Sequence, residues 1–269
     1  MGDRLGSPLP PGSLLQLMYL KERLTRLSVG RFVEIGPGKG EIAALLLARG
    51  WTGLLCEYEA RTAEQLLIRF RDDVNAGRLE ITNEDYLNAP IRSKADLVIS
   101  SMVIEHLDDQ SELRFMAKAA TDLRPGGCMV GLVPASPNHW GIEDEIAGHY
   151  RRYTRSSLSK LLIRSGWKLR HVAGLTFPVS NWLLPLSNAL VYRTERYKKG
   201  LSPLQRTKES GRRSVPFKTS FPPVLGFLLN ERLLLPFHLL QKLCSRSEHA
   251  LVLYFEAEPT IVGGEGLGW

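Results

Sequence analysis

The sequence lacks the cysteine pattern and the long apolar runs that define several protein classes. Its three cysteines, Cys56, Cys128 and Cys244, are scattered and odd in number, and no two have the spacing of a metal site. A disulfide scaffold and a cysteine-ligated metal centre are therefore disfavoured. A membrane-spanning helix needs roughly 20 apolar residues, and the best candidate stretch, 221–244, is interrupted by prolines and charged residues.

Residues 1–12 also lack the apolar core of a secretory signal peptide. We therefore expect a flexible lead and a cytoplasmic protein. No internal repeat is present. The chain has 269 residues, of which 43% are hydrophobic. That is enough for one domain with a sizeable core and an elaboration.

The excess of positive charge belongs to one segment. The whole chain has a net charge of +7, and residues 193–218 alone contain nine lysines and arginines against two acids. Basic segments bind anionic membrane surfaces or nucleic acid. This one has few aromatic residues to stack on bases and no nucleic-acid motif, so we favour a membrane surface or a lipid-like ligand over nucleic acid.

A glycine-rich stretch, 31–42, predicts a buried strand, a tight loop and the start of a helix; it reads Arg-Phe-Val-Glu-Ile-Gly-Pro-Gly-Lys-Gly-Glu-Ile. Gly36, Gly38 and Gly40 permit turns and a close approach of ligand to backbone that a Cβ would prevent. The helix start behind them offers free N–H groups. A dinucleotide loop would have glycine where this chain has Glu41, so the loop alone leaves its ligand open.

Strands and helices alternate through the first 175 residues. Strands are predicted at 31–35, 51–57, 79–82, 95–100, 128–133 and 167–175, and again at 248–256; helices are predicted at 13–27, 42–49, 61–74, 111–123 and 156–165. A turn is expected at 124–127. This alternation implies an α/β fold with a parallel sheet that helices cover on both faces.

A long insertion separates the last two predicted strands, where roughly 2–6 residues would be usual. It contains apolar helical stretches at 179–197 and 224–243, joined by the basic segment. We divide the chain into the lead 1–12, a core of 13–175 and 248–262, the basic helical insertion 176–247 and a tail 263–269. The insertion is expected to form a lid over the bound substrate or a cap that faces a membrane.

Acidic side chains lie at the ends of three successive predicted strands: Glu34, Glu57 and Asp85. In open α/β sheets the ligand binds beyond the carboxyl ends of the strands. A carboxylate there can accept hydrogen bonds from ribose hydroxyls or from an adenine amino group. Three such acids beside a glycine loop point to a nucleotide-like cofactor more strongly than any one of them.

These features, taken in order, resemble the class I S-adenosylmethionine (SAM) methyltransferases. The glycine loop with Glu34 is similar to their first motif, the segment 95–109 (Ala-Asp-Leu-Val-Ile-Ser-Ser-Met-Val-Ile-Glu-His-Leu-Asp-Asp) to their fourth-strand segment, and Leu123-Arg-Pro-Gly-Gly127 to the turn before strand five. The resemblance covers roughly residues 31–170 and the last strand. It is nearest to the bacterial small-molecule group and the quinone O-methyltransferases.

The resemblance implies a Rossmann-like, seven-stranded, mostly parallel sheet with an antiparallel last strand, and SAM as cofactor. It places the glycine loop at the methionine part, Glu57 at the ribose and Asp85 at the adenine, with Tyr86 covering the ring. The predicted cofactor-binding residues are Glu34, Gly36, Gly38, Gly40, Glu57, Tyr58, Asp85, Tyr86 and Ser101.

A metal site is not expected. Glu105-His106 resembles the quinone-biosynthesis O-methyltransferases, in which an acid three residues earlier contributes to a metal site, but that position is Met102 here. We interpret His106 as a residue with a local hydrogen bond.

Two other histidines are candidates for a general base. Gly148-His-Tyr-Arg-Arg-Tyr-Thr154 resembles a segment of the bacterial small-molecule methyltransferases, and His149 within it could take a proton from a substrate hydroxyl. His139 competes for the role. Alternatively both only hydrogen-bond, while the neighbouring arginines anchor the loop to acids at 143–145. Because a methyl sulfonium is already a strong electrophile, alignment alone could also suffice.

The function predicted from these residues is methyl transfer from SAM to an oxygen of a hydrophobic small molecule, such as a quinone, a polyketide or a lipid-like acceptor. The alternatives are a non-catalytic SAM-fold partner subunit, an RNA methyltransferase, or methylation of nitrogen or carbon. An anionic membrane surface is a second expected partner, at the inner face of a membrane. The sequence does not indicate an oligomeric state.

Overall fold

The computed structural model describes residues 8–200, 215 and 221–260. Most of the predicted lead, most of the basic connection within the insertion and the tail lie outside these residues.

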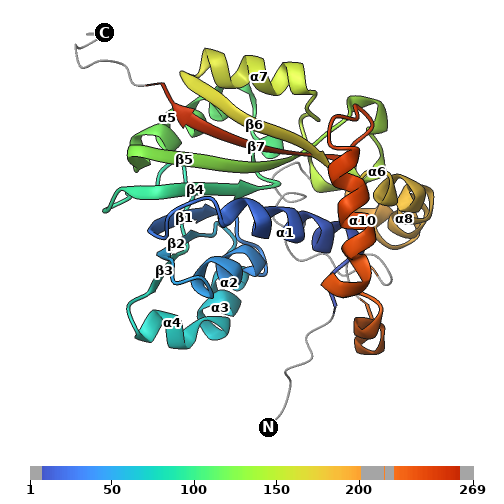
Figure 1. Cartoon of the computed structure of the whole chain (residues 1–269), viewed down its shortest axis with the longest axis horizontal. Helices are drawn as coiled ribbons and strands as arrows, with labels where there is room; N and C mark the ends of the chain where they lie inside the picture. Colours follow the sequence, from blue (N-terminus) through green and yellow to red (C-terminus); the bar gives the residue numbers. More distant parts are fainter. Residues whose placement is uncertain (1–7, 201–214, 216–220, 261–269) are drawn as a thin grey trace.

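One seven-stranded sheet organises the molecule (Figure 1), in the spatial order β3-β2-β1-β4-β5-β7-β6. Its strands are β1 (Arg31–Ile35), β2 (Thr52–Cys56), β3 (Leu79–Thr82), β4 (Ala95–Ser101), β5 (Leu123–Pro134), β6 (Trp167–Leu175) and β7 (Val252–Pro259). The first five pair in parallel, and β7 lies antiparallel between β5 and β6. The predicted fold is confirmed, including the antiparallel last strand.

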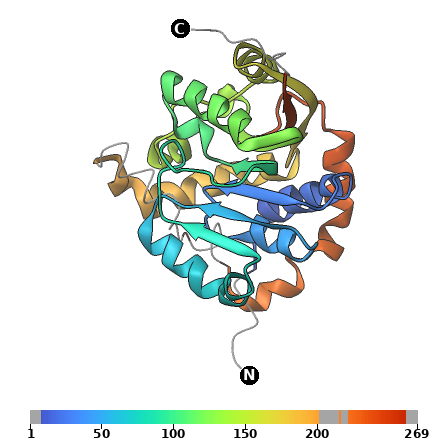
Figure 2. The same cartoon turned by 90° about the vertical axis from the view of Figure 1, so that its left-hand side faces the viewer.

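Helices cover both faces of the sheet (Figures 1 and 2), because the central strands are buried on both sides. One face packs against α5 (Asp109–Asp122) and α7 (Arg155–Arg164). The other packs against α1 (Pro11–Leu24), α2 (Glu41–Leu47) and α3 (Ala60–Arg69), with α4 (Arg71–Asn75) following α3. Two apolar cores result, which the sheet separates.

The insertion leaves the sheet at one edge and returns to the same edge. Leu175, the last residue of β6, pairs with Val252, the first residue of β7. Between them lie α8 (Val179–Glu195), the 3₁₀ turns η3 (Arg196–Gly200) and η4 (Pro223–Phe227), and α10 (Glu231–Leu243). β6 runs in the same direction as the parallel strands, so this is the edge at which their carboxyl ends lie. Figure 1 shows α8 and α10 at that end of the molecule.

Several boundaries differ from the prediction. The helix expected at 61–74 is split at Phe70 into α3 and α4. The turn expected at 124–127 is part of β5, at the point where its register with β4 shifts. The helix expected at 224–243 begins at Glu231, after Asn230 has accepted hydrogen bonds from the N–H groups of the next turn. Among the described residues, no helix is both long and apolar enough to cross a membrane.

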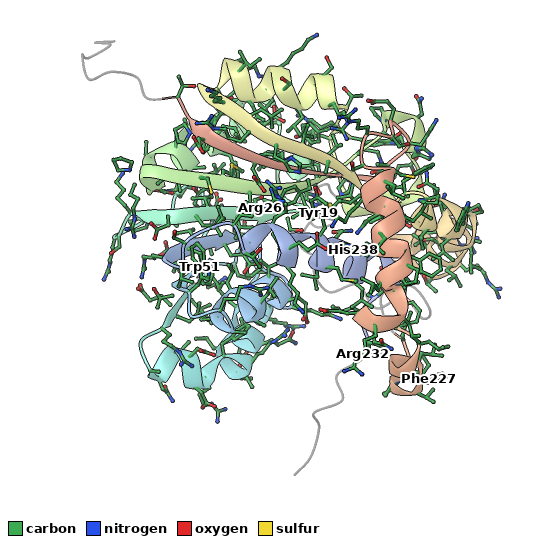
Figure 3. All side chains as sticks on the ribbon, in the orientation of Figure 1. Tyr19, Arg26, Trp51, Phe227, Arg232 and His238 are labelled. Carbon is green, nitrogen blue, oxygen red and sulfur yellow. The ribbon has the colours of Figure 1, made fainter. Side chains whose placement is uncertain are left out.

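A polar hub attaches the insertion to the core. The side chain of Gln241 on α10 accepts a hydrogen bond from Thr176 N–H (2.9 Å) and donates one to the Leu15 carbonyl of α1 (2.9 Å). Its amide nitrogen also lies 2.8 Å from His238 Nδ1, and His238 Nε2 lies 2.7 Å from Glu22 Oε1. In Figure 3 His238 lies on α10 on the side of α1, and Tyr19 lies above α1 towards the sheet. The face of α10 that contacts the core is therefore partly polar.

Candidate active site at the carboxyl edge of the sheet

The glycine loop provides an open cradle beside β1. Gly36, Gly38 and Gly40 have φ values of +62°, +54° and +79°, a region that favours glycine. A Cβ on Gly36 would approach a methyl group of Val103 to 2.7 Å, and one on Gly40 would lie 2.5 Å from the Phe70 ring. A Cβ on Gly38 would meet nothing within 4 Å. The first and third glycines therefore allow tight packing, whereas the second faces open space.

Glu34 lies buried beneath this loop. Its Oε2 has no hydrogen-bond partner among the described residues, and the carboxyl accepts a hydrogen bond from Ala43 N–H of α2. Burial raises the pKa of Glu34 to about 8, and the Ala43 hydrogen bond opposes this rise only in part. An unsatisfied buried oxygen beside an open loop fits a bound polar ligand.

Glu57 lies just beyond the end of β2 and connects that strand to the loop. Its carboxyl accepts hydrogen bonds from Gly38 N–H and from Glu59 N–H (2.9 Å). Burial raises the pKa of Glu57 to about 7, and hydrogen bonds from Gly38 N–H and Tyr58 N–H oppose this rise. The amide of Asn83, after β3, donates to the Glu57 and Tyr58 carbonyls at 2.9 and 3.1 Å. The half-exposed ring of Tyr58 follows directly.

Asp85 and Tyr86 are adjacent in sequence but occupy different environments. Asp85 lies in the turn after β3, where its carboxyl accepts from Leu87 N–H (3.1 Å) and from the Asn88 amide (2.8 Å). Tyr86 is buried, packs edge-to-face on Phe115 and donates to Asp122 Oδ2 at 2.7 Å. The ring predicted to cover the adenine therefore belongs to the core under α5, because its hydroxyl finds its acceptor there.

Strained backbone follows three of the strands that end at this edge. Met102 after β4, Ser136 after β5 and Thr176 after β6 have φ values of 56°, 58° and 69° without being glycine. Such conformations cost about 1–3 kcal/mol each and concentrate at functional sites. Ser101 ends β4 beside Met102, whose N–H donates to the Leu132 carbonyl at 2.9 Å. The chain turns sharply where the ligand of an open α/β sheet binds.

A carboxylate–histidine pair lies next to these turns. His149 Nδ1 is 2.9 Å from Asp144 Oδ1, and Asp144 is fully buried. His149 Nε2 is 3.8 Å from Glu105 Oε1, beyond hydrogen-bond distance. Glu105 belongs to η1 (Ile104–His106), two residues after the Val103 methyl that Gly36 approaches. This chain of contacts places His149 at the same edge of the sheet as the glycine loop, where the parallel strands end.

Burial dominates the electrostatics around His149. Neither oxygen of Glu105 has a hydrogen-bond partner in the described structure, and desolvation raises the pKa of Glu105 to about 7. Desolvation lowers the pKa of His106 to about 3, so its imidazole is neutral. Glu105, His106 and His149 each offer one atom within 4.8 Å of the others and could hold a divalent cation. The prediction of no metal stays a prediction.

His139 lies apart from this pair. It belongs to η2 (Pro137–His139), and its Nδ1 is 2.9 Å from Ser136 Oγ. Partial burial lowers the pKa of His139, and its ring faces His249 instead of His149. The structure therefore separates the two candidate bases.

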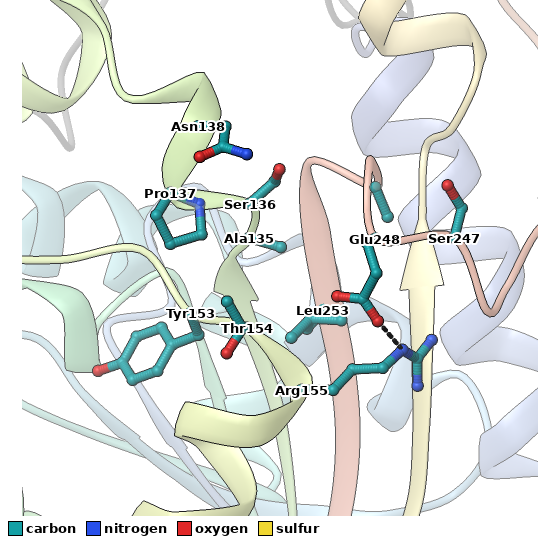
Figure 4. A pocket seen from close by; sticks show the side chains of 11 residues that line it. Ala135, Ser136, Pro137, Asn138, Tyr153, Thr154, Arg155, Ser247, Glu248 and Leu253 are labelled. Atoms are coloured by element: carbon teal, nitrogen blue, oxygen red, sulfur yellow. Dashed lines mark ion pairs between the residues drawn. The ribbon is translucent and has the colours of Figure 1, made fainter.

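An open hollow of about 340 Å³ lies beside Ser136 (Figure 4), between the end of β5, the start of α7 and the chain before β7. Arg155 and Glu248 line it, 3.9 Å apart. No residue of the glycine loop borders it, so it is not the site that the loop forms.

The segment 148–154, which contains His149, is anchored by more acidic residues than the sequence suggested. Arg152 contacts Asp144 Oδ1 at 2.8 Å, as expected, but Arg151 and Tyr153 reach Glu112 on α5, at 3.3 and 2.6 Å. Asp144 itself lies in the short helix α6 (Ile142–Ala147), which was not predicted. The sequence offered one signal for the Asp144–His149 pair. Asp144 stands five residues before His149, and Gly148 between them permits a turn that brings the two side chains together.

Comparison with known families identifies the family to which the chain belongs. A family model described as "Methyltransferase domain" matches residues 14–172, more than half of the chain. The chain belongs to this methyltransferase family. Its cofactor is S-adenosylmethionine, and the open loop at Gly38 and the unpartnered oxygen of Glu34 fit a bound group there. No curated protein sequence matches the methyltransferase.

Solved structures show a similar fold. The glycopeptide N-methyltransferase MtfA with bound SAM aligns at a TM-score of 0.49 and 17% identity, over 58% of this chain and 79% of that one. The mitomycin 7-O-methyltransferase MmcR aligns at 0.49 and 20%, over 60% and 50%. A SAM-dependent methyltransferase from Clostridium acetobutylicum ATCC 824 aligns at 0.49 and 11%, over 60% and 82%. At these values the likeness carries no argument about substrate.

Proposed function

We propose that this methyltransferase transfers a methyl group to an oxygen of a hydrophobic small molecule, with His149 as general base. The contact that carries the proposal is His149 Nδ1 to Asp144 Oδ1 at 2.9 Å. A carboxylate that accepts from Nδ1–H leaves the lone pair on Nε2, and a base in that tautomer can accept a hydroxyl proton. SAM, when bound, supplies an electrophilic methyl sulfonium.

The chain's own residues have separate tasks in this proposal. The glycine loop and Glu34 hold the methionine end of the cofactor, Glu57 the ribose and Asp85 the adenine, with Tyr58 and Ser101 at the rim of the site. Tyr86 is left out of this set because its ring is buried against Phe115 and its hydroxyl donates to Asp122. Buried Asp144 fixes the orientation of His149, and Arg152 balances the carboxylate charge at 2.8 Å.

The insertion supports a hydrophobic acceptor. α8 packs on α6, the helix that contains Asp144, and Ser187 on α8 donates to Glu143 at 2.6 Å. Asn181 on the same helix donates to the His249 carbonyl at 2.9 Å and lies 3.5 Å from His139 Nε2. α8 thus lies against the loop between β5 and α7, and most of this helix is apolar in sequence.

The test compares His149→Gln with the matched variant His139→Gln. Methyl transfer from isotopically labelled SAM into lipid and phenolic fractions of a cell extract is measured, and SAM affinity is measured by calorimetry. Since a general base contributes about 10²–10⁴-fold, we expect His149→Gln to lose at least about 100-fold in turnover with unchanged SAM affinity. His139→Gln should keep most of the activity.

Three results would overturn the assignment. If His149→Gln were as active as wild type, His149 would not be the general base. If only His139→Gln lost activity, His139 would be the base instead. A labelled product that ribonuclease destroys would replace the small-molecule acceptor by RNA. Asp144→Asn should reproduce the His149 defect with unchanged SAM affinity.

A further inference from the structure

The outer faces of α8 and α10 are apolar, although both helices lie at the surface. On α10 the residues at positions 232, 236, 239 and 243 form one outward stripe at helical spacing, Arg232, Pro236, Leu239 and Leu243, and Leu243 is 84% exposed. On α8 the same spacing gives Trp182, Leu186, Ala189 and Arg193, with Trp182 66% exposed. Each stripe consists of apolar residues and one arginine.

The inward face of α10 is polar, which is the reverse of a usual surface helix. His238 and Gln241 point inward, with exposures of 1% and 0%, and their polar atoms are satisfied by Glu22, Leu15 and Thr176. A surface helix normally buries its apolar face and exposes its polar one. α10 instead places these polar residues against the core and presents leucine to the outside. Contiguous apolar patches of this kind mark a surface that another phase or molecule covers.

Charge indicates which partner covers it. The stripe on α8 ends at Arg193 and the stripe on α10 begins at Arg232, so both arginines lie at the helix ends joined by the basic segment 193–218. That segment contains the entire net excess of +7 in the sequence. Figure 3 shows Arg232 and the exposed Phe227 of η4 at the same end of α10. Aromatic and apolar side chains flanked by arginine suit the boundary of an anionic bilayer.

A second copy of the chain fits less well. A twofold interface brings the same surface patch together from both subunits. Pairing through the α8 and α10 stripes would bring Arg193 and Arg232 of both copies to one interface, where like charges repel. An anionic lipid surface matches both the apolar stripes and this charge.

We propose that the outward stripes of α8 and α10, with η4 before α10, dock the methyltransferase on an anionic membrane surface. The insertion leaves the sheet at the edge that holds the cofactor loop, so docking would turn the active-site edge towards the bilayer. This deepens the proposed function, since a lipid-dissolved acceptor would then enter from the membrane. Docking requires no turnover, so it can fail or hold independently of the methyl acceptor.

The test is cosedimentation of the full chain with phosphatidylcholine vesicles, with and without phosphatidylglycerol. We expect binding to the anionic vesicles that weakens as salt rises, and little binding to phosphatidylcholine alone. Trp182→Ser and Leu243→Ser should each weaken binding roughly tenfold, because each removes one large apolar contact. Arg232→Gln should weaken it by a smaller factor and reduce the salt dependence.

Matched controls lie at the opposite edge of the sheet. Ile163, near the end of α7, is 70% exposed, and Lys168 is exposed at the amino end of β6. Ile163→Ser and Lys168→Gln should leave vesicle binding unchanged. The proposal is overturned by absence of binding, by equal binding to neutral vesicles, or by stripe and control variants behaving alike. A dimer in sedimentation analysis that Leu243→Ser dissociates would assign the face to a second copy instead.

Discussion

Glu34 makes the stability of this methyltransferase depend on pH in an unusual direction. Its carboxyl is buried below the glycine loop with one oxygen unpartnered, and burial raises its pKa from 4.5 to about 8. The native state therefore keeps a proton that the unfolded chain releases above pH 4.5. By linkage, this contribution to stability is fully present below the unfolded pKa and is lost as pH rises towards the folded pKa.

The size of the effect follows from the two pKa values. As pH rises from about 5 to 8, ionisation of Glu34 lowers the free energy of unfolding by about 3.5 kcal/mol. This is a large part of a typical folding free energy. Glu34→Gln has the shape of the protonated acid but does not titrate. The free-energy difference between wild type and this variant should therefore change by about that amount across the range.

Urea denaturation at several pH values, followed by circular dichroism without cofactor, measures this difference. Wild type should lose stability relative to Glu34→Gln as pH rises, and the two curves should diverge steadily between about pH 5 and pH 8. Parallel curves across the whole range would refute the reasoning, because they would mean that Glu34 has the same pKa in both states. Global charge effects cancel, since the two proteins differ at one position.

Three further predictions concern the cofactor site, the polar hub and metal dependence. Glu57→Ala should weaken SAM binding about 10–100-fold in calorimetry, because a hydrogen bond to a charged group contributes about 1.5–3 kcal/mol; unchanged affinity would remove the ribose assignment. Gln241→Leu should cost about 2–4 kcal/mol in urea denaturation, since it strands Thr176 N–H and the Leu15 carbonyl in the interior; a loss under about 1 kcal/mol would contradict the hub. Chelation by EDTA should leave turnover unchanged; activity lost and restored by Mg²⁺ would show that Glu105, His106 and His149 bind a cation.

Much of the architecture was predictable because it depends on local patterns. Apolar runs followed by polar loops indicated the strands, and the alternation of strands with helices implied the parallel sheet that is observed. The positions of Glu34, Glu57 and Asp85 at one edge follow from the same rule, since parallel strands end on the same side. No long-range information was needed for either step.

The parts that escaped prediction depend on partners far away in sequence. Tyr86 looked like a rim residue beside Asp85, but its hydroxyl finds Asp122, 36 positions later. The Asp144–His149 pair required α6, a six-residue helix too short for a periodic signal. The insertion's helices were expected, but their orientation was not, because an apolar helix with His238 and Gln241 gives no indication of which face turns inward.

The orientation of α10 leads to a test that separates folding from docking on one helix. Gln241 is buried and bonded to two other elements, so its loss should destabilise the fold. Leu243, two residues later and 84% exposed, contributes little burial, so Leu243→Ser should leave the free energy of unfolding within about 0.5 kcal/mol of wild type. If Leu243→Ser instead destabilised the free protein as much as Gln241→Leu, its side chain would already be packed in solution. The outward stripe would then be part of the fold and unavailable to a membrane.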